Sequence, residues 1–77
     1  MNELATQFGK NVRRTRKAKG IAQERLALLT GIDRSYVGRI ERGEVNITLE
    51  KVYIISATLE CELSELLPTP VQKFLPQ

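Results

Sequence analysis

Apolar residues recur every three or four positions along most of this chain, which is the period of an α-helix. In residues 2–19 they form a single stripe on a helical wheel, made of Leu4, Ala5, Phe8 and Val12. Arg16 falls at the edge of that stripe, so we expect it to be the one arginine of this helix that is partly buried. Gly20 follows and ends the helix.

Two short helices are predicted next, over residues 23–30 and 34–42, with a tight turn between them. Gly31 supplies the left-handed conformation that ends the first helix, and Asp33 supplies an N-cap oxygen for the second. Leu26 and Leu29 are expected to face inward, whereas Ala22 offers no side-chain cap, which costs about 1 kcal/mol relative to Ser or Thr. Two helices joined in this way form a helix-turn-helix unit, whose second helix can enter the major groove of DNA.

The helix predicted over 34–42 has one apolar and one polar face. Val37 and Ile40 point towards the core, and the opposite face contains no acidic residue and includes Arg34, Ser35, Gly38, Arg39 and Arg42. Tyr36 lies on the border between the two faces. A glycine inside a helix costs about 1 kcal/mol relative to alanine. We therefore interpret Gly38 as a position where the backbone approaches DNA closely, the alternative being an exposed glycine without a role.

The remaining chain predicts one longer helix and one short one. Thr48 is the expected N-cap of a helix that runs to about Leu59, with Ile54 pointing outward and an inward face of Leu49, Val52, Ile55, Ser56 and Leu59. A short helix follows over residues 62–67 and is stopped by prolines. The expected organisation is all-α, with one five-helix domain over residues 1–67 and a C-terminal tail over 68–77.

Charge is distributed unevenly along the chain. Residues 1–42 contain ten Lys and Arg against four Asp and Glu, a net +6, whereas residues 43–77 contain two against five, a net −3. This polarity is typical of a domain with one end facing a polyanion, although a solvated basic helix would look the same.

Catalytic and metal-binding residues are scarce. The chain has no histidine and one cysteine, Cys61, which excludes a His-based catalytic dyad, a Cys/His zinc site and an intrachain disulfide. We therefore expect no enzyme activity, no cofactor and no metal. We also find no signal peptide and no stretch of about 18 apolar residues, and we expect a cytoplasmic protein of a prokaryote or phage.

The chain resembles a known family over about residues 8–67. VRRTRKAKGIAQERLALLTGIDRSYVGRIERG followed by TLEKVYIISATLECELSELL is similar to the lambda-repressor-like, Cro-type (Xre) helix-turn-helix family. The shared pattern combines Lys-Gly before the second helix, Gln at its start, Leu-Ala within it, the hinge glycine and Ile-Glu-Arg-Gly closing the third helix. DRSYVGRIERGEVN also resembles controller proteins of restriction–modification systems. The sequence departs from the family pattern at Ala22, Ile47 and Glu60.

The resemblance implies a compact bundle of about five helices that binds double-stranded DNA sequence-specifically and regulates transcription as a repressor or controller. It implies, together with the helical wheel, base contacts from Arg34, Ser35, Tyr36, Gly38 and Arg39. It implies phosphate contacts from Gln23, Arg42, Asn46 and Thr48, and an internal ion pair between Arg16 and Glu41. For the arginines, the alternative is an exposed side chain held by a surface ion pair.

One recognition helix reads only a few base pairs, so useful specificity implies a homodimer on a pseudo-palindromic operator. The expected dimer contacts are Ile54, Leu63, Leu66, Phe74 and Leu75. For Ile54, Phe74 and Leu75 the alternative is packing within the chain or ordinary exposure, and Leu63 and Leu66 are also expected to contribute to the core from the short helix over 62–67. The alternative function is an antitoxin-type interaction module that also binds DNA, which a co-purifying partner protein would distinguish.

Overall fold

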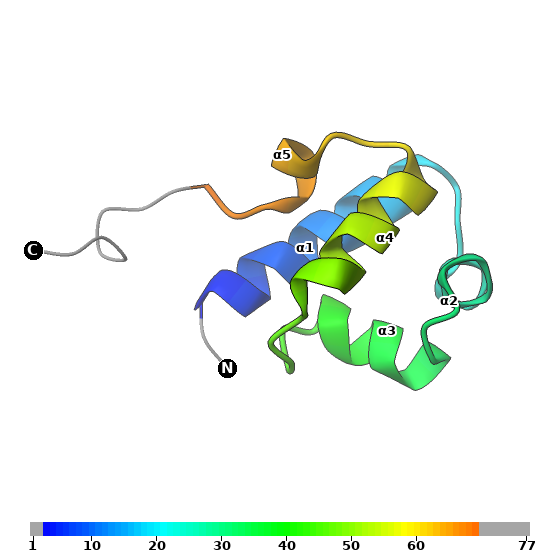
Figure 1. Cartoon of the computed structure of the whole chain (residues 1–77), viewed down its shortest axis with the longest axis horizontal. Helices are drawn as coiled ribbons and strands as arrows, with labels where there is room; N and C mark the ends of the chain where they lie inside the picture. Colours follow the sequence, from blue (N-terminus) through cyan, green and yellow to red (C-terminus); the bar gives the residue numbers. More distant parts are fainter. Residues whose placement is uncertain (1–2, 70–77) are drawn as a thin grey trace, which may run out of the picture.

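Five α-helices make up most of residues 3–69, the part of the chain that the computed structural model describes (Figure 1). They are α1 (Glu3–Ala18), α2 (Gln23–Thr30), α3 (Arg34–Glu41), α4 (Leu49–Leu59) and α5 (Leu63–Leu66). No strand occurs between residues 3 and 69. The predicted all-α class and the five helices are therefore confirmed. Within the same residues, no helix is long and apolar enough to cross a membrane.

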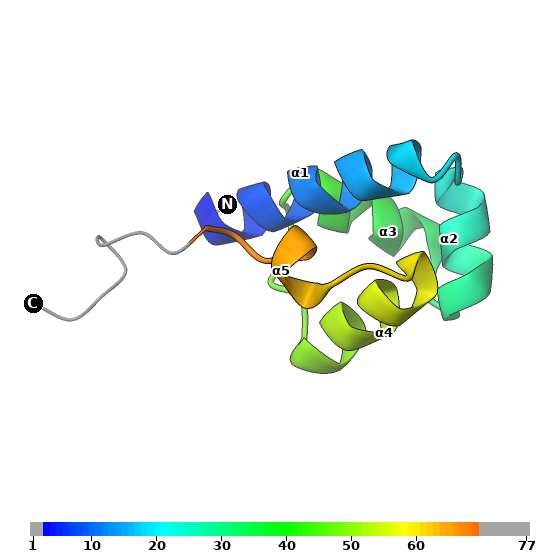
Figure 2. The ribbon, with the colours of Figure 1, turned by 90° about the horizontal axis from the view of Figure 1, so that it is seen from above.

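The helices enclose one aliphatic core. α1 packs against α3 and α5, and α2 packs against α3 and α4, so that α3 and α5 lie on opposite sides of the domain (Figures 1 and 2). Every helix contributes at least one buried apolar side chain; the core consists of Phe8, Val12, Leu26, Ala27, Ile32, Val37, Ile40, Val52, Ile55, Leu59 and Leu66. Burying these groups is the main source of stability for a domain of this size.

The helix ends follow the capping residues that the sequence contains. Gly31 has a left-handed backbone with φ 77° and ends α2, and the Asp33 carboxylate accepts from the backbone N–H of Ser35 at 3.1 Å. The Thr48 hydroxyl oxygen accepts from the backbone N–H of Lys51 at 3.2 Å. Ala22 provides no side-chain cap for α2, as expected. These caps set the angle between α2 and α3 and the start of α4.

Three leucines that we expected to face the core are exposed instead. Leu49 is 72% exposed, Leu29 48% and Leu4 42%, and each lies in the first or last turn of its helix. A helical wheel gives the direction of a side chain but not the extent of the element that would cover it. These inward assignments were therefore wrong.

One residue that we predicted to lie at a dimer surface is buried instead. Leu66 is 0% exposed and belongs to the core, because the single turn of α5 points this side chain into the domain. It cannot contact a second copy, and that prediction was wrong. Leu63 and Ile54 are half-buried, Leu63 packing against the core. Phe74 and Leu75 lie outside the described residues.

Candidate nucleic-acid interface

A buried ion pair joins α1 to α3. The Arg16 guanidinium donates from Nε to Oε2 of Glu41 at 2.7 Å and from Nη2 to Oε1 at 2.9 Å, and it donates from Nη1 to the carbonyl oxygen of Ile21 at 2.7 Å. Arg16 is 6% exposed and Glu41 7%. The hydrogen bond to the Glu41 carboxylate raises the pKa of Arg16. The two residues that the sequence paired are thus in contact, and the arginine is more deeply buried than expected.

Gln23 extends this ion pair to α2. Its Nε2 donates to Oε1 of Glu41 at 2.9 Å, so the Glu41 carboxylate holds side chains from α1 and α2 against α3. The sequence had indicated only a phosphate contact for Gln23. One amide hydrogen is used by Glu41, and the second remains for another acceptor. No buried side-chain nitrogen or oxygen between residues 3 and 69 lacks a hydrogen-bond partner.

Gly9 allows α1 and α3 to approach each other closely. A Cβ atom at this position would lie 2.6 Å from the carbonyl oxygen of Glu41, which is too close for any side chain. Gly9 was not predicted as a contact position, although a glycine inside a helix is the same signal that indicated Gly38. Together with the Arg16–Glu41 pair, this contact fixes the position of α3 in the domain.

The outward side of α3 presents polar side chains to solvent. Arg34, Ser35 and Arg39 are exposed, and Tyr36 is half-buried with its ring against the core. The Ser35 hydroxyl donates to the Asp33 carboxylate, and this hydrogen bond lowers the pKa of Asp33. The oxygen of Ser35 keeps lone pairs with which it can accept a hydrogen bond.

Gly38 differs from our expectation of an open position. It is buried, because the Arg42 side chain covers it: a Cβ atom at Gly38 would lie 3.1 Å from Arg42 Nη1 and 3.9 Å from Gln23 Oε1. Contact between the Gly38 backbone and a base would require Arg42 to move away. Arg42 itself is exposed, and so are Asn46 and Thr48 in the segment between α3 and α4.

Acidic side chains from neighbouring segments contact the arginines of this surface. Glu44 Oε2 lies 2.7 Å from Arg42 Nε, and Glu44 Oε1 lies 3.3 Å from Arg42 Nη2 and 3.8 Å from Arg39 Nε. Glu24 lies 4.0 Å from Arg34 Nε. The polar face of α3 has no acidic residue of its own, so a surface ion pair was only the alternative for these arginines and its acidic partners were not predicted. The hydrogen bond from Arg42 lowers the pKa of Glu44, which is therefore charged at neutral pH.

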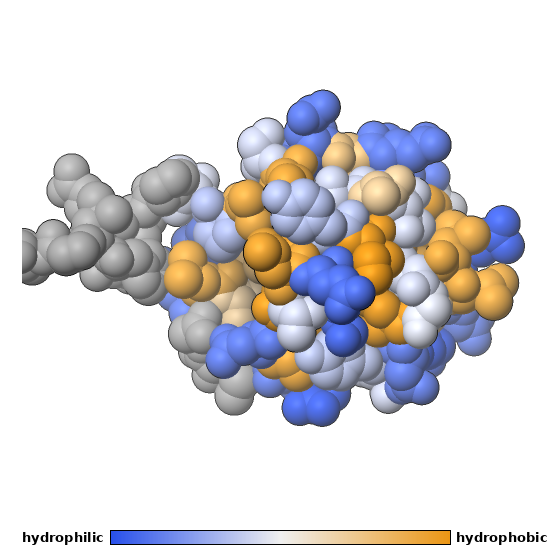
Figure 3. All heavy atoms as spheres, in the orientation of Figure 1, coloured by the Kyte–Doolittle hydropathy of each residue, from blue (hydrophilic) through white to orange (hydrophobic). Residues whose placement is uncertain are grey.

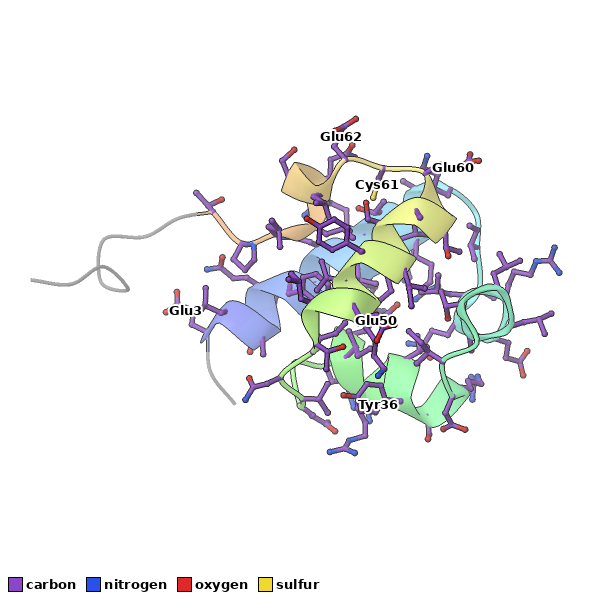
Figure 4. All side chains as sticks on the ribbon, in the orientation of Figure 1. Glu3, Tyr36, Glu50, Glu60, Cys61 and Glu62 are labelled. Atoms are coloured by element: carbon purple, nitrogen blue, oxygen red, sulfur yellow. The ribbon has the colours of Figure 1, made fainter. Side chains whose placement is uncertain are left out.

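A groove of about 580 Å³ separates α3 from α4. Tyr36, Arg39, Glu50, Lys51 and Ile54 are among the residues that line it, and Figure 4 shows Tyr36 and Glu50 on its two sides. Lys51 Nζ lies 5.7 Å from the centre of the Tyr36 ring, within the range of a cation–π contact. Residues 3–69 contain no group of three His, Cys, Asp or Glu side chains that could hold a metal ion.

The short α2, the turn at Gly31 and the polar outer side of α3 define a helix-turn-helix protein. A helix-turn-helix family model matches residues 12–66, and the chain belongs to this family. It is similar to the control protein C.MunI of Mycoplasma sp, with 39% identity over 67 residues that cover 86% of this chain and 90% of the relative.

Solved structures of restriction–modification controller proteins have the same fold. C.AhdI from Aeromonas hydrophila matches with a TM-score of 0.78 and 44% identity, covering 82% of this chain and 96% of that protein. The C.Esp1396I tetramer, solved in complex with its natural 35-base-pair operator, matches with a TM-score of 0.75 and 31% identity. The match covers 80% of this chain and 82% of the C.Esp1396I chain.

Proposed function

We propose that this protein is a transcriptional regulator that binds double-stranded DNA sequence-specifically as a homodimer, with α3 in the major groove. The observation that carries this proposal is the placement of α3: its outer side is polar and carries exposed arginines, while its inner side is fixed by the core and the Arg16–Glu41–Gln23 contacts. A recognition helix requires both features, because base contacts depend on a defined helix position.

Arg34 and Arg39 are the proposed base-reading residues. A guanidinium group matches the O6 and N7 acceptors of guanine, and each good pair contributes roughly 1–3 kcal/mol of discrimination. Both side chains are exposed and free of the core. Ser35 would accept from a base amino group through its hydroxyl oxygen, while Tyr36 lies beside the groove and would contact the backbone or a base edge.

The proposed phosphate contacts come from both sides of α3. Gln23 lies in the first turn of α2, where backbone N–H groups favour an anion, and its second amide hydrogen would donate to a phosphate. Arg42, Asn46 and Thr48 follow the reading residues and would hold the neighbouring phosphates. Gly38 would contribute indirectly, by giving the Arg42 side chain space to change position.

The homodimer would use the outer face of α4 and the segment around α5. Figure 3 shows several apolar side chains on this face, with hydrophilic side chains between them, and Tyr53 and Leu67 are exposed at 55% and 44%. Tyr53 and Leu67 replace Leu66 among the proposed contacts, and the half-buried Ile54 and Leu63 are kept. Because α3 has only eight residues, two copies are needed to read a site of useful length.

Selection from a pool of random duplexes tests the proposal. The expected result is an enriched motif with two-fold symmetry and half-sites about one helical turn apart. Sedimentation of the complex should give two chains per motif, or a multiple of two. Binding without an enriched motif would overturn the proposal, and so would a complex with a single chain on a symmetric site.

A further inference from the structure

Glu44 occupies a fixed backbone position at the end of α3. The backbone N–H of Gly43 donates to Ile40 O at 3.0 Å and that of Glu44 to Arg39 O at 2.9 Å, which is the pattern of a Schellman motif. Gly43 has φ 74°, and a Cβ atom at this position would lie 2.7 Å from the Thr6 Cα atom. Glu44 therefore cannot move without disturbing the contact between this turn and α1.

The carboxylate of Glu44 is in an unfavourable place with respect to the helix. The C-terminal end of a helix carries partial negative charge, and a basic residue would be the stabilising choice there. Glu44 instead neutralises the two arginines that flank the end of α3, with two hydrogen bonds to Arg42 and one longer contact to Arg39. The helix dipole alone thus gives no reason for an acid at this position, and it is the pairs with Arg42 and Arg39 that stabilise the charged carboxylate.

The contact to each arginine leaves different atoms free. Arg42 uses Nε and Nη2, so turning towards a phosphate breaks its pair with Glu44. Arg39 approaches Glu44 through Nε, at 3.8 Å, which leaves Nη1 and Nη2 for an end-on contact with guanine. Arg39 can therefore keep its contact with the Glu44 carboxylate while Nη1 and Nη2 contact a base.

We propose that Glu44 is a specificity-determining residue, an internal anion that weakens binding to random DNA more than binding to the operator. In a non-specific complex both arginines turn to phosphates, and the carboxylate is left unpaired beside a polyanion. In the operator complex Arg39 retains Glu44 while it contacts guanine. This role rests on the proposed function, because it assigns Arg39 to a base.

The test compares Glu44→Gln with wild-type protein on the selected motif and on a random duplex of equal length. The expected result is tighter binding to both duplexes, because Arg42 leaves Glu44 for a phosphate in each complex. The gain on the random duplex should exceed the gain on the motif by about 1.5- to five-fold, the range that an exposed ion pair allows. Glu60→Gln is the matched control, since it changes net charge equally at the opposite side of the domain from Tyr36 (Figure 4). It should change binding to neither duplex.

Three outcomes would overturn the role of Glu44. The first is that Glu44→Gln tightens binding to both duplexes equally. The second is that Glu44→Gln weakens binding to the motif. The third is that Glu60→Gln changes binding to the two duplexes as much as Glu44→Gln does. The proposed function is tested separately, by the wild-type protein alone. If wild-type protein does not distinguish the two duplexes, the proposed function fails and the specificity role of Glu44 fails with it, whatever Glu44→Gln does.

Discussion

The guanidinium of Arg16 and the carboxylate of Glu41 face each other with two hydrogen bonds, at 2.7 and 2.9 Å, inside the contact between α1 and α3. Because Gln23 donates to the same carboxylate, this one acid connects the helix that starts the domain with both helices of the helix-turn-helix unit. The position of the outer face of α3 therefore depends on a pair that lies beneath it.

Removing one partner of this pair should destabilise the protein more than removing both. Arg16→Met or Glu41→Leu leaves a buried charge unpaired, at a cost of about 3–5 kcal/mol in the free energy of unfolding. The double variant should be less destabilised than either single variant. Urea denaturation of the four proteins measures this coupling. Additive effects would contradict the proposed structural role of the pair.

Gly9→Ala should destabilise the domain without touching its polar surface. The added methyl group would meet the carbonyl oxygen of Glu41 at 2.6 Å, so α1 and α3 must separate, at a cost of about 1–3 kcal/mol. Gly20→Ala is the control. Its Cβ atom meets nothing within 4 Å, and the left-handed backbone alone costs about 1–2 kcal/mol. Unfolding temperatures should fall in both, and only Gly9→Ala should also weaken DNA binding at a temperature where the protein is folded.

Gly38→Ala should have opposite effects on stability and on binding. The methyl group would lie 3.1 Å from the end of the Arg42 side chain, which is exposed and can move aside. Thermal unfolding should therefore show a gain of up to about 1 kcal/mol from helix propensity. DNA affinity should fall, and it should be lost with Gly38→Glu, which places a carboxylate on the same face. Full affinity of a folded Gly38→Glu protein would contradict the assignment of this face.

The lowered pKa of Asp33 should make the free energy of unfolding depend on pH. Its hydrogen bonds from Ser35 lower its pKa in the folded state, so its stabilising contribution is present above the ordinary value of 3.8 and is lost as pH falls through the lower folded value. Asp33→Asn keeps an acceptor but does not titrate. The stability difference between the two proteins, measured by urea denaturation from pH 6 downward, should favour wild type near neutrality and shrink in acid. A difference that is independent of pH would contradict the capping role of the charge.

The sequence predicted what depends on neighbouring residues. A left-handed backbone at Gly31 ends α2, and side-chain oxygens of Asp33 and Thr48 cap the starts of α3 and α4. The structure agrees with the prediction at all three positions. The core direction of each helix also follows from its period. These local rules were enough for the fold class and for the helix-turn-helix unit.

What the sequence did not predict depends on contacts between distant segments. Leu29 and Leu49 are exposed in the last and first turns of their helices, whereas Leu66, which was predicted to contact a second copy, is enclosed by the fold. Glu44 reaches Arg39 and Arg42 only because the turn at the end of α3 brings it back. A helical wheel treats each helix separately, so it cannot predict contacts between residues of different segments.

The central claim, that α3 reads sequence through Arg34 and Arg39, is tested most directly by the ratio of affinities for the selected motif and for a random duplex. At a fixed salt concentration, wild-type protein should show a ratio of at least about a thousand. Arg34→Ala and Arg39→Ala should each lower this ratio by roughly 5- to 150-fold, while affinity for the random duplex changes much less. Equal losses on both duplexes, with the ratio unchanged, would contradict base reading by these arginines and leave them only phosphate contacts.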